Sequence, residues 1–203
     1  TQGYSSAASD VYKRQVFIDA MGQLNRNNGL GKEVLAFILV PAGHAGANKE
    51  LLHNLELPYQ AVTSTDLYLT HYLNDSANDP VMNRIRAQKL RNSEEDKVKI
   101  FFVPSYLNGD DGVFNMPYYD LLVGMDLTAF PSYYEPWGYT PLESLAFKVP
   151  TITTTLAGFG LWVKEHYNMN HPGIEVIHRE DGDASNVATA IAEWVKNLSL
   201  IHI

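Results

Sequence analysis

The chain has 203 residues, of which 45% are hydrophobic and 19% charged, a balance typical of a folded protein with one ordinary domain or two small ones. Its formal net charge of −8 argues against a nucleic-acid partner, and the absence of cysteine excludes disulfides and thiolate metal sites and fits a cytoplasmic enzyme. The longest apolar run, residues 34–42, is too short for a transmembrane helix, and no signal peptide is evident, so we expect no membrane partner.

The first half of the chain contains two continuous apolar stretches, which predict strands covered on both faces. Apolar residues at helical spacing, and a proline placed in a first turn, predict helices around these strands. The basic residues at positions 84, 86, 89 and 91 are read as a solvated helix face. In chain order, the predicted elements are a helix over 16–25, a strand over 34–40, a glycine- and alanine-rich loop over 42–48, helices over 66–74 and 80–91, and a strand over 98–103.

From residue 117 onward, short helices and strands alternate regularly. This alternation predicts an α/β fold, with a mainly parallel sheet and helices on both faces. In such sheets ligands bind at the carboxyl ends of strands, which directs attention to the loops over residues 104–117, 131–140 and 155–160. The predicted elements are helix 117–124, strand 127–131, helix 140–147, strand 151–154, helix 160–167, strand 174–177 and helix 184–197.

The stretch from Glu135 to Glu143 joins a loop to a strong helix start. Thr140 is placed to cap the helix, a proline follows in the first helical position, and Glu143 stands where a capping box needs an acidic residue. The N–H groups and dipole of such a helix end stabilise a phosphate without a cation. The two glutamates lie eight residues apart, so both can reach one ligand, although capping alone also explains Glu143.

The run PSYYEPWGYTPLES at residues 131–144, followed by TITTTLAGFG at 151–160, closely resembles the donor-site signature of the family 3 retaining glycosyltransferases, the eukaryotic-type glycogen synthases. Similar blocks extend the resemblance over about residues 16–197. It implies the C-terminal, Rossmann-like nucleotide-sugar-binding domain of a glycosyltransferase-B fold, present here in incomplete form, with the active site in the cleft between two such domains.

The resemblance also implies a reaction. The parent enzyme would transfer glucose from a nucleotide sugar, usually UDP-glucose, to the non-reducing end of an α-1,4-glucan such as glycogen, with retention of configuration. It would need no cofactor or metal, and it would be a cytoplasmic homo-oligomer.

Site residues are implied by the same motif. Glu135 would be catalytic, bonding the glucose hydroxyls near the reacting carbon and stabilising its developing positive charge. Gly158 would lie in a glycine loop near the sugar, and Trp137 is expected to pack beneath the loop. The other donor-binding residues would be Glu143 at the ribose, Gly138, Tyr139 and Thr140 at the diphosphate, and Tyr118 and Tyr106 at the uracil, although Tyr118 also suits a core position. His71 is expected to be a hydrogen-bonded structural histidine.

The N-terminal stretch departs from the family pattern. The family carries an arginine and, six residues later, a lysine that bind the donor diphosphate, and residues 6–15 replace that stretch here. Lys13 and Arg14 have the wrong spacing, so that role is not transferred to them. Residues 6–15 and 198–203 resemble translated adapter sequence. We therefore expect residues 1–15 and 198–203 to be foreign to the family, leaving 16–197 as one incomplete domain.

We therefore expect the isolated chain to be inactive and to bind nucleotide weakly. Two other readings stay open: another retaining glycosyltransferase of the same fold, and a non-catalytic nucleotide-sugar-binding module.

Overall fold

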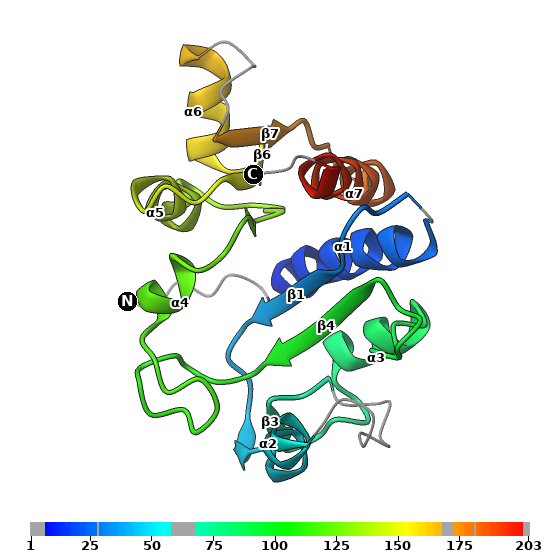
Figure 1. The fold of residues 1–203 in the computed structure, drawn as a ribbon. Helices are drawn as coiled ribbons and strands as arrows, with labels where there is room; N and C mark the ends of the chain where they lie inside the picture. The colour runs from blue at the N-terminus through cyan, green and yellow to red at the C-terminus, as the bar shows by residue number, and fades with distance from the viewer. Residues whose placement is uncertain (1–6, 28, 58–67, 168–172, 181, 201–203) are drawn as a thin grey trace. The chain divides into compact units, whose positions relative to one another are not determined.

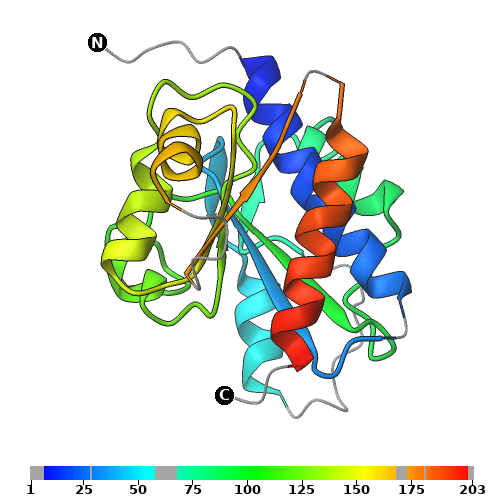
Figure 2. The ribbon, with the colours of Figure 1, turned by 90° about the horizontal axis from the view of Figure 1, so that it is seen from above.

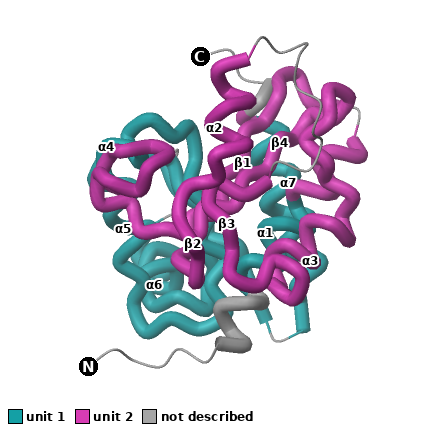
Figure 3. Tube along the Cα trace, turned by 90° about the horizontal axis from the view of Figure 1, so that it is seen from below, with its two compact units in different colours: residues 1–20, 119–197 teal, residues 21–118, 198–203 magenta. Residues whose placement is uncertain are grey.

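The computed structural model describes residues 7–27, 29–57, 68–167, 173–180 and 182–200 (Figure 1). The chain divides into two compact units (Figure 3). The first-strand unit comprises residues 21–118 with 198–203, and the three-strand unit comprises residues 1–20 with 119–197. The prediction of one domain over 16–197, with foreign ends, stays a prediction.

The first-strand unit is built on a parallel pair, β1 (Val34–Leu39) and β4 (Val98–Val103), which confirms both apolar strands. Val98, Ile100 and Phe102 of β4 are completely buried. In contrast, Leu35 of β1 is 63% exposed, so the expectation that this strand is covered on both faces is wrong. Within the described residues β1 pairs with β4 alone, which makes it an edge strand.

Two short strands were missed by the sequence reasoning. β2 (His44–Ala47) and β3 (His71–Leu73) pair in antiparallel fashion, where a loop over 42–48 and a helix over 66–74 were predicted. Both predictions are wrong over the described residues; positions 66 and 67 lie outside them. These strands are too short, and β2 too rich in glycine and alanine, to show the two-residue apolar period of a strand.

Two helices complete this unit. α2 (Lys49–Glu56) was not predicted, and it begins at Asn48, whose side chain accepts hydrogen bonds from two N–H groups of the first turn. α3 (Pro80–Ala87) begins at an aspartate cap, as a helix with proline in its first turn should. It ends before the predicted residue 91, because Lys89 adopts a left-handed φ of 59°.

The three-strand unit contains the parallel sheet β5 (Thr128–Ala129), β6 (Thr151–Thr154) and β7 (Ile174–Ile177), in the order β5-β6-β7. Every residue of the central strand β6 is buried. Two helices, α5 (Tyr139–Ala146) and α6 (Gly158–His166), lie on one side of β7, and α7 (Ala184–Leu200) lies on the other (Figure 2). The predicted α/β arrangement, with parallel strands and helices on both faces, is therefore confirmed.

Two further helices each contain a position at which the chain passes from one unit to the other. α1 (Ala7–Arg26) continues upstream of the predicted start at residue 16, and α4 (Tyr118–Leu122) follows the loop over residues 104–117. No helix in the described ranges combines the length and apolar character needed to cross a bilayer.

The cap of α2 gives a prediction about stability. The buried Asn48 side chain accepts from the N–H groups of Glu50 and Leu51 and donates to the carbonyl of Leu69. Asn48→Ala should lower the free energy of unfolding of this unit by about 1–2 kcal/mol in urea titrations. His53→Ala, at an exposed position of the same helix, should change it by less than about 0.5 kcal/mol, and equal effects would contradict the capping role.

Candidate functional site

Two loops meet at the carboxyl edge of the three-stranded sheet. The loop after β5 carries Glu135, whose N–H donates to the carbonyl of Leu156 at 3.1 Å in the loop after β6. The carbonyl of Glu135 in turn accepts from the N–H of Gly158 at 3.1 Å, which completes a parallel bridge. The sequence singled out both loops, and their backbones are joined at the predicted catalytic residue.

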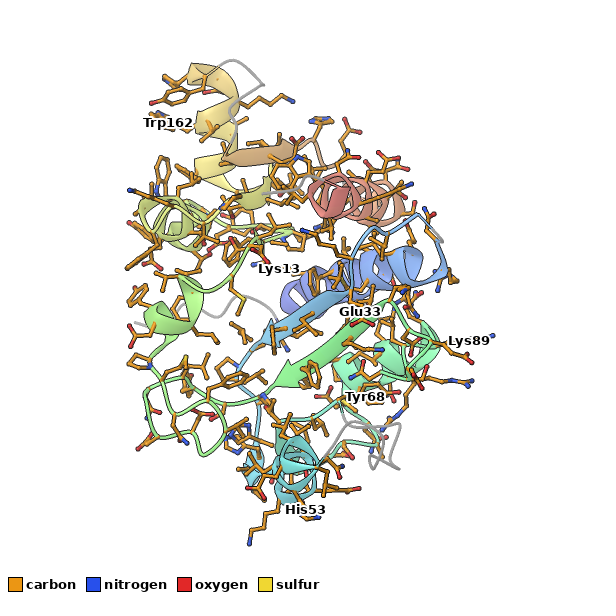
Figure 4. All side chains as sticks on the ribbon, in the orientation of Figure 1. Lys13, Glu33, His53, Tyr68, Lys89 and Trp162 are labelled. Carbon is orange, nitrogen blue, oxygen red and sulfur yellow. The ribbon has the colours of Figure 1, made fainter. Side chains whose placement is uncertain are left out.

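Gly158 allows this close approach. A Cβ atom at this position would overlap the carbonyl oxygen of Pro136, so no larger residue fits without moving the backbone. The N–H of the next residue, Phe159, donates to the carbonyl of Trp137 at 2.6 Å. The Trp137 ring centroid lies 5.9 Å from that of Phe159 and 6.4 Å from that of Trp162, which projects from α6 (Figure 4). Trp137 is nevertheless 37% exposed, so the loop covers it only in part.

The start of α5 differs from the predicted capping box. The helix begins at Tyr139, and the capping position is held by Gly138, which makes no side-chain capping bond. Thr140 is therefore the second helical residue rather than the cap, Pro141 is the third, and Glu143 lies too far along to complete a capping box. Gly138 has φ 93°, and this left-handed turn starts the helix earlier than the Thr-Pro pattern suggests.

Capping of α5 therefore does not explain Glu143. Its half-buried side chain lies beyond the capping position, and Gly138, which holds that position, has no side chain to bond the first N–H groups of α5. The arrangement keeps the positive end of the helix dipole next to the loop that carries Glu135.

The carboxylate of Glu135 is anchored at one oxygen and still accessible. Ser132 donates its hydroxyl to Oε2 at 2.9 Å. The Nζ of Lys13, a residue of α1 that Figure 4 labels, lies 3.9 Å from the same oxygen. The Glu135 side chain is 32% exposed. Lys13 belongs to the segment expected to be foreign to the family, so no role is assigned to it.

Ser132 and Arg179 were missed by the sequence reasoning. Arg179, only 3% exposed, donates to the carbonyls of Pro131 at 2.7 Å and Ser132 at 3.3 Å. Thr154, at the end of β6, donates its hydroxyl to the same Ser132 carbonyl at 2.7 Å. For Arg179 the sequence did offer a signal. The residue lies two positions after the apolar strand 174–177, which places it at the carboxyl edge of the sheet.

The predicted site residues divide between the two units. Glu135, Gly138, Tyr139, Thr140 and Glu143 lie in the three-strand unit, where the structure brings them together around the start of α5. Tyr106 and Tyr118 belong to the first-strand unit. Tyr106 is 74% exposed, and Tyr139 is 68% exposed. Among the described residues, no three histidine, aspartate or glutamate side chains gather as metal ligands would.

Comparison with known proteins decides the family. Residues 60–200, more than half of the chain, match the family described as glycogen synthase. The chain belongs to the glycogen synthase family. Within this family it is 36% identical over 131 residues to glycogen (starch) synthase isoform 1 of Saccharomyces cerevisiae, an alignment covering 63% of this chain and 18% of the yeast protein.

Two further relatives extend the match. Isoform 2 of the same yeast is 29% identical over 248 residues, covering 89% of this chain and 35% of the relative. The liver glycogen (starch) synthase of Mus musculus is 42% identical over 97 residues, covering 48% of this chain and 14% of the relative. The chain thus spans between about a seventh and a third of the length of these glycogen synthases.

The loop over residues 104–117 is held by buried polar groups. His71 is fully buried, with Nε2 2.8 Å from the carbonyl oxygen of Asp111 and Nδ1 2.9 Å from the hydroxyl of Thr70, which confirms it as a hydrogen-bonded structural histidine. His44 lies in β2 rather than in the predicted loop over residues 42–48, with its ring centroid 4.7 Å from that of His71. Burial, and then the charge of His71, lower the pKa of His44.

Asp111 organises the tip of this loop. Its carboxylate accepts hydrogen bonds from the N–H groups of Val113, Phe114 and Asn115 at 2.8–3.1 Å, and its side chain is fully buried. Burial raises the pKa of Asp111, but these backbone bonds together outweigh burial, so its pKa is lowered.

Gly158 supplies a stability prediction for the joined loops. Gly158→Ala should force the loops after β5 and β6 apart and lower the free energy of unfolding by about 1–3 kcal/mol in urea titrations. Gly173→Ala is the matched control, because its Cβ would meet only Leu145 at an ordinary 3.5 Å. Equal stability of the two variants would contradict the close approach at Gly158.

Asp111 supplies a pH prediction. Because its folded pKa lies below the unfolded value, its contribution to stability is present above about pH 3.9 and is lost as pH falls through the folded pKa. Asp111→Ala should therefore cost about 1–3 kcal/mol at pH 7. The difference between the two proteins in urea titrations should shrink at acidic pH, and a difference independent of pH would contradict this account.

Proposed function

We propose that the chain is the donor-binding part of a retaining glucosyltransferase that elongates an α-1,4-glucan. In the complete enzyme, glucose would pass from UDP-glucose to the non-reducing end of the glucan. One observation carries the proposal. The loop that holds the anchored, accessible carboxylate of Glu135 leads directly into the start of α5, where Gly138 provides no side-chain cap. Membership of the glycogen synthase family supports the same reaction.

Glu135 is the proposed catalytic residue. A carboxylate held at one oxygen by Ser132 leaves its other oxygen to accept from a glucose hydroxyl beside the reacting carbon. Its negative charge would also stabilise the positive charge that develops on the sugar in the transition state. Because the backbone of Glu135 is bonded on both sides to the loop after β6, the carboxylate needs little rearrangement to act.

The rest of the donor is assigned to the helix start and to two tyrosines. The diphosphate would bind the N–H groups at Gly138, Tyr139 and Thr140, where the dipole of α5 favours an anion. Glu143, which has no capping role, would accept from the ribose hydroxyls. Tyr106 and Tyr118 would contact the uracil.

Neither a metal ion nor a cofactor is required by this proposal, since the start of α5 would supply positive charge for the leaving diphosphate, joined by basic side chains in the complete enzyme. The family arginine and lysine that would add such charge are not matched in this sequence. We therefore propose that the chain alone binds donor weakly and does not transfer glucose. The complete enzyme is proposed to be a cytoplasmic homo-oligomer that acts on glycogen.

The role of Glu135 is tested best in a complete relative. In the yeast isoform 2 protein, which aligns with 89% of this chain, the residue aligned with Glu135 is changed to glutamine. Turnover with UDP-glucose and glycogen should fall by about 100- to 1,000-fold, while donor affinity changes much less, because the lost charge acts mainly on the transition state. Turnover close to that of the unchanged enzyme would overturn the assignment.

The donor is tested on the chain itself. Titration with UDP-glucose, ADP-glucose and GDP-mannose, followed by NMR, should give the strongest binding for UDP-glucose. A preference for another base would favour a different retaining glycosyltransferase of the same fold. A module that binds the nucleotide without acting on the sugar should lose binding in Tyr118→Ala and tolerate Glu135→Gln, whereas the enzyme should lose turnover in Glu135→Gln.

A further inference from the structure

Arg179 is a buried cation that contacts three consecutive residues of the loop after β5. It follows β7, and its NH1 donates to the carbonyls of Pro131 at 2.7 Å and Ser132 at 3.3 Å. Its guanidinium carbon lies 5.3 Å from the centre of the Tyr133 ring. The planar guanidinium therefore binds this loop in two ways, through hydrogen bonds to its carbonyls and through the face of an aromatic ring.

The backbone of Arg179 is held independently of its side chain. Its N–H donates to the hydroxyl of Thr155 at 3.0 Å, and that hydroxyl lies 3.4 Å from the Arg179 carbonyl. Thr155 is the first residue after β6, and its own N–H donates to the carbonyl of Ile177 at 3.0 Å. The Arg179 backbone is therefore fixed to the ends of the paired strands β6 and β7, and its side chain extends from there to the loop after β5.

The contacts continue from Arg179 to the carboxylate of Glu135. Arg179 and Thr154 both donate to the Ser132 carbonyl, and the Ser132 hydroxyl donates to Oε2 of Glu135 at 2.9 Å. Ser132 is 2% exposed, and the two bonds to its carbonyl hold the backbone from which its hydroxyl projects. A shift of this backbone would therefore turn the carboxylate as well.

We propose that Arg179 is a positioning residue, which holds the loop after β5 so that Ser132 aims the Glu135 carboxylate at the glucose of the donor. This inference rests on the proposed function for the identity of the ligand. A guanidinium suits the task because it stays charged at every physiological pH and offers its donors in a fixed plane. Lysine at this position would keep the charge but lose the planar group that covers Tyr133.

The experiment compares Arg179→Lys with the control His178→Gln in the full chain. His178 is the adjacent residue, and its exposed ring lies 3.2 Å from the Glu180 carboxylate. Each protein is titrated with UDP-glucose and, separately, with UDP. Arg179→Lys should weaken UDP-glucose binding about tenfold and UDP binding by less than about twofold, since only the sugar is read by Glu135. The control should bind both ligands as the unchanged chain does.

A purely structural role for Arg179 predicts a different result. Damage to the whole site would weaken UDP and UDP-glucose binding by the same factor, and that outcome would overturn the inference. Ser132→Ala provides a second variant that leaves the Arg179 contacts in place. Like Arg179→Lys, it should weaken the binding of UDP-glucose more than the binding of UDP. Equal effects on both ligands, or no effect, would also overturn the inference.

Amide hydrogen exchange separates this inference from the proposed function. The N–H groups of Ser132 and Glu135, bonded to the carbonyls of Phe130 and Leu156, should exchange about tenfold faster in Arg179→Lys. The N–H of Val187 in α7 should keep its rate and shows that the fold is retained. If the chain without substitutions binds neither ligand, the proposed function fails for this chain. The positioning role is then tested by exchange alone, and equal exchange rates at Ser132 and Glu135 with and without Arg179→Lys would overturn it.

Discussion

Two backbone hydrogen bonds, made by the N–H and the carbonyl of Glu135, join the loop after β5 to the loop after β6. The other features of the candidate site depend on this pairing. It requires a glycine at position 158, because any Cβ there would meet the Pro136 carbonyl. It also fixes the chain just before Gly138, whose left-handed turn begins α5 without a capping side chain. The carboxylate and the helix start are therefore held by the same few bonds.

Buried polar side chains hold the loop after β5 as firmly as the backbone bonds of this pairing do. Burying a guanidinium is costly unless its charge is well solvated by the protein, and Arg179 is solvated by two carbonyls and an aromatic face. Thr154 adds a third bond to the same segment. In the first-strand unit, Asp111 and His71 hold another loop by the same means, with buried side chains bonded to backbone groups. Loops held by buried polar bonds keep a functional carboxylate in place better than mobile loops do.

Sequence reasoning succeeded where local pattern decides structure. The continuous apolar runs at 34–40 and 98–103 and the alternation after residue 117 predicted the parallel strands, because burial selects such runs. It failed for β2 and β3, which are too short to show a period. It also failed at α5, where the Thr140–Glu143 pattern matched a capping box but the positive φ of Gly138 started the helix earlier. Arg179 could not be linked to Glu135 from sequence, since the two lie 44 positions apart (179 − 135) and only the fold brings them together.

The central claim is that the loop carrying Glu135 and the start of α5 form one donor site in this member of the glycogen synthase family. Mapping backbone amide NMR shifts of the chain during titration with UDP-glucose tests it most directly. The account predicts the largest changes in amide chemical shift over residues 132–140 and 156–159. The changes at residues next to the Glu135 carboxylate should be smaller with UDP than with UDP-glucose. Shifts confined to β2 and β3, or the same shifts with both ligands around Glu135, would contradict it.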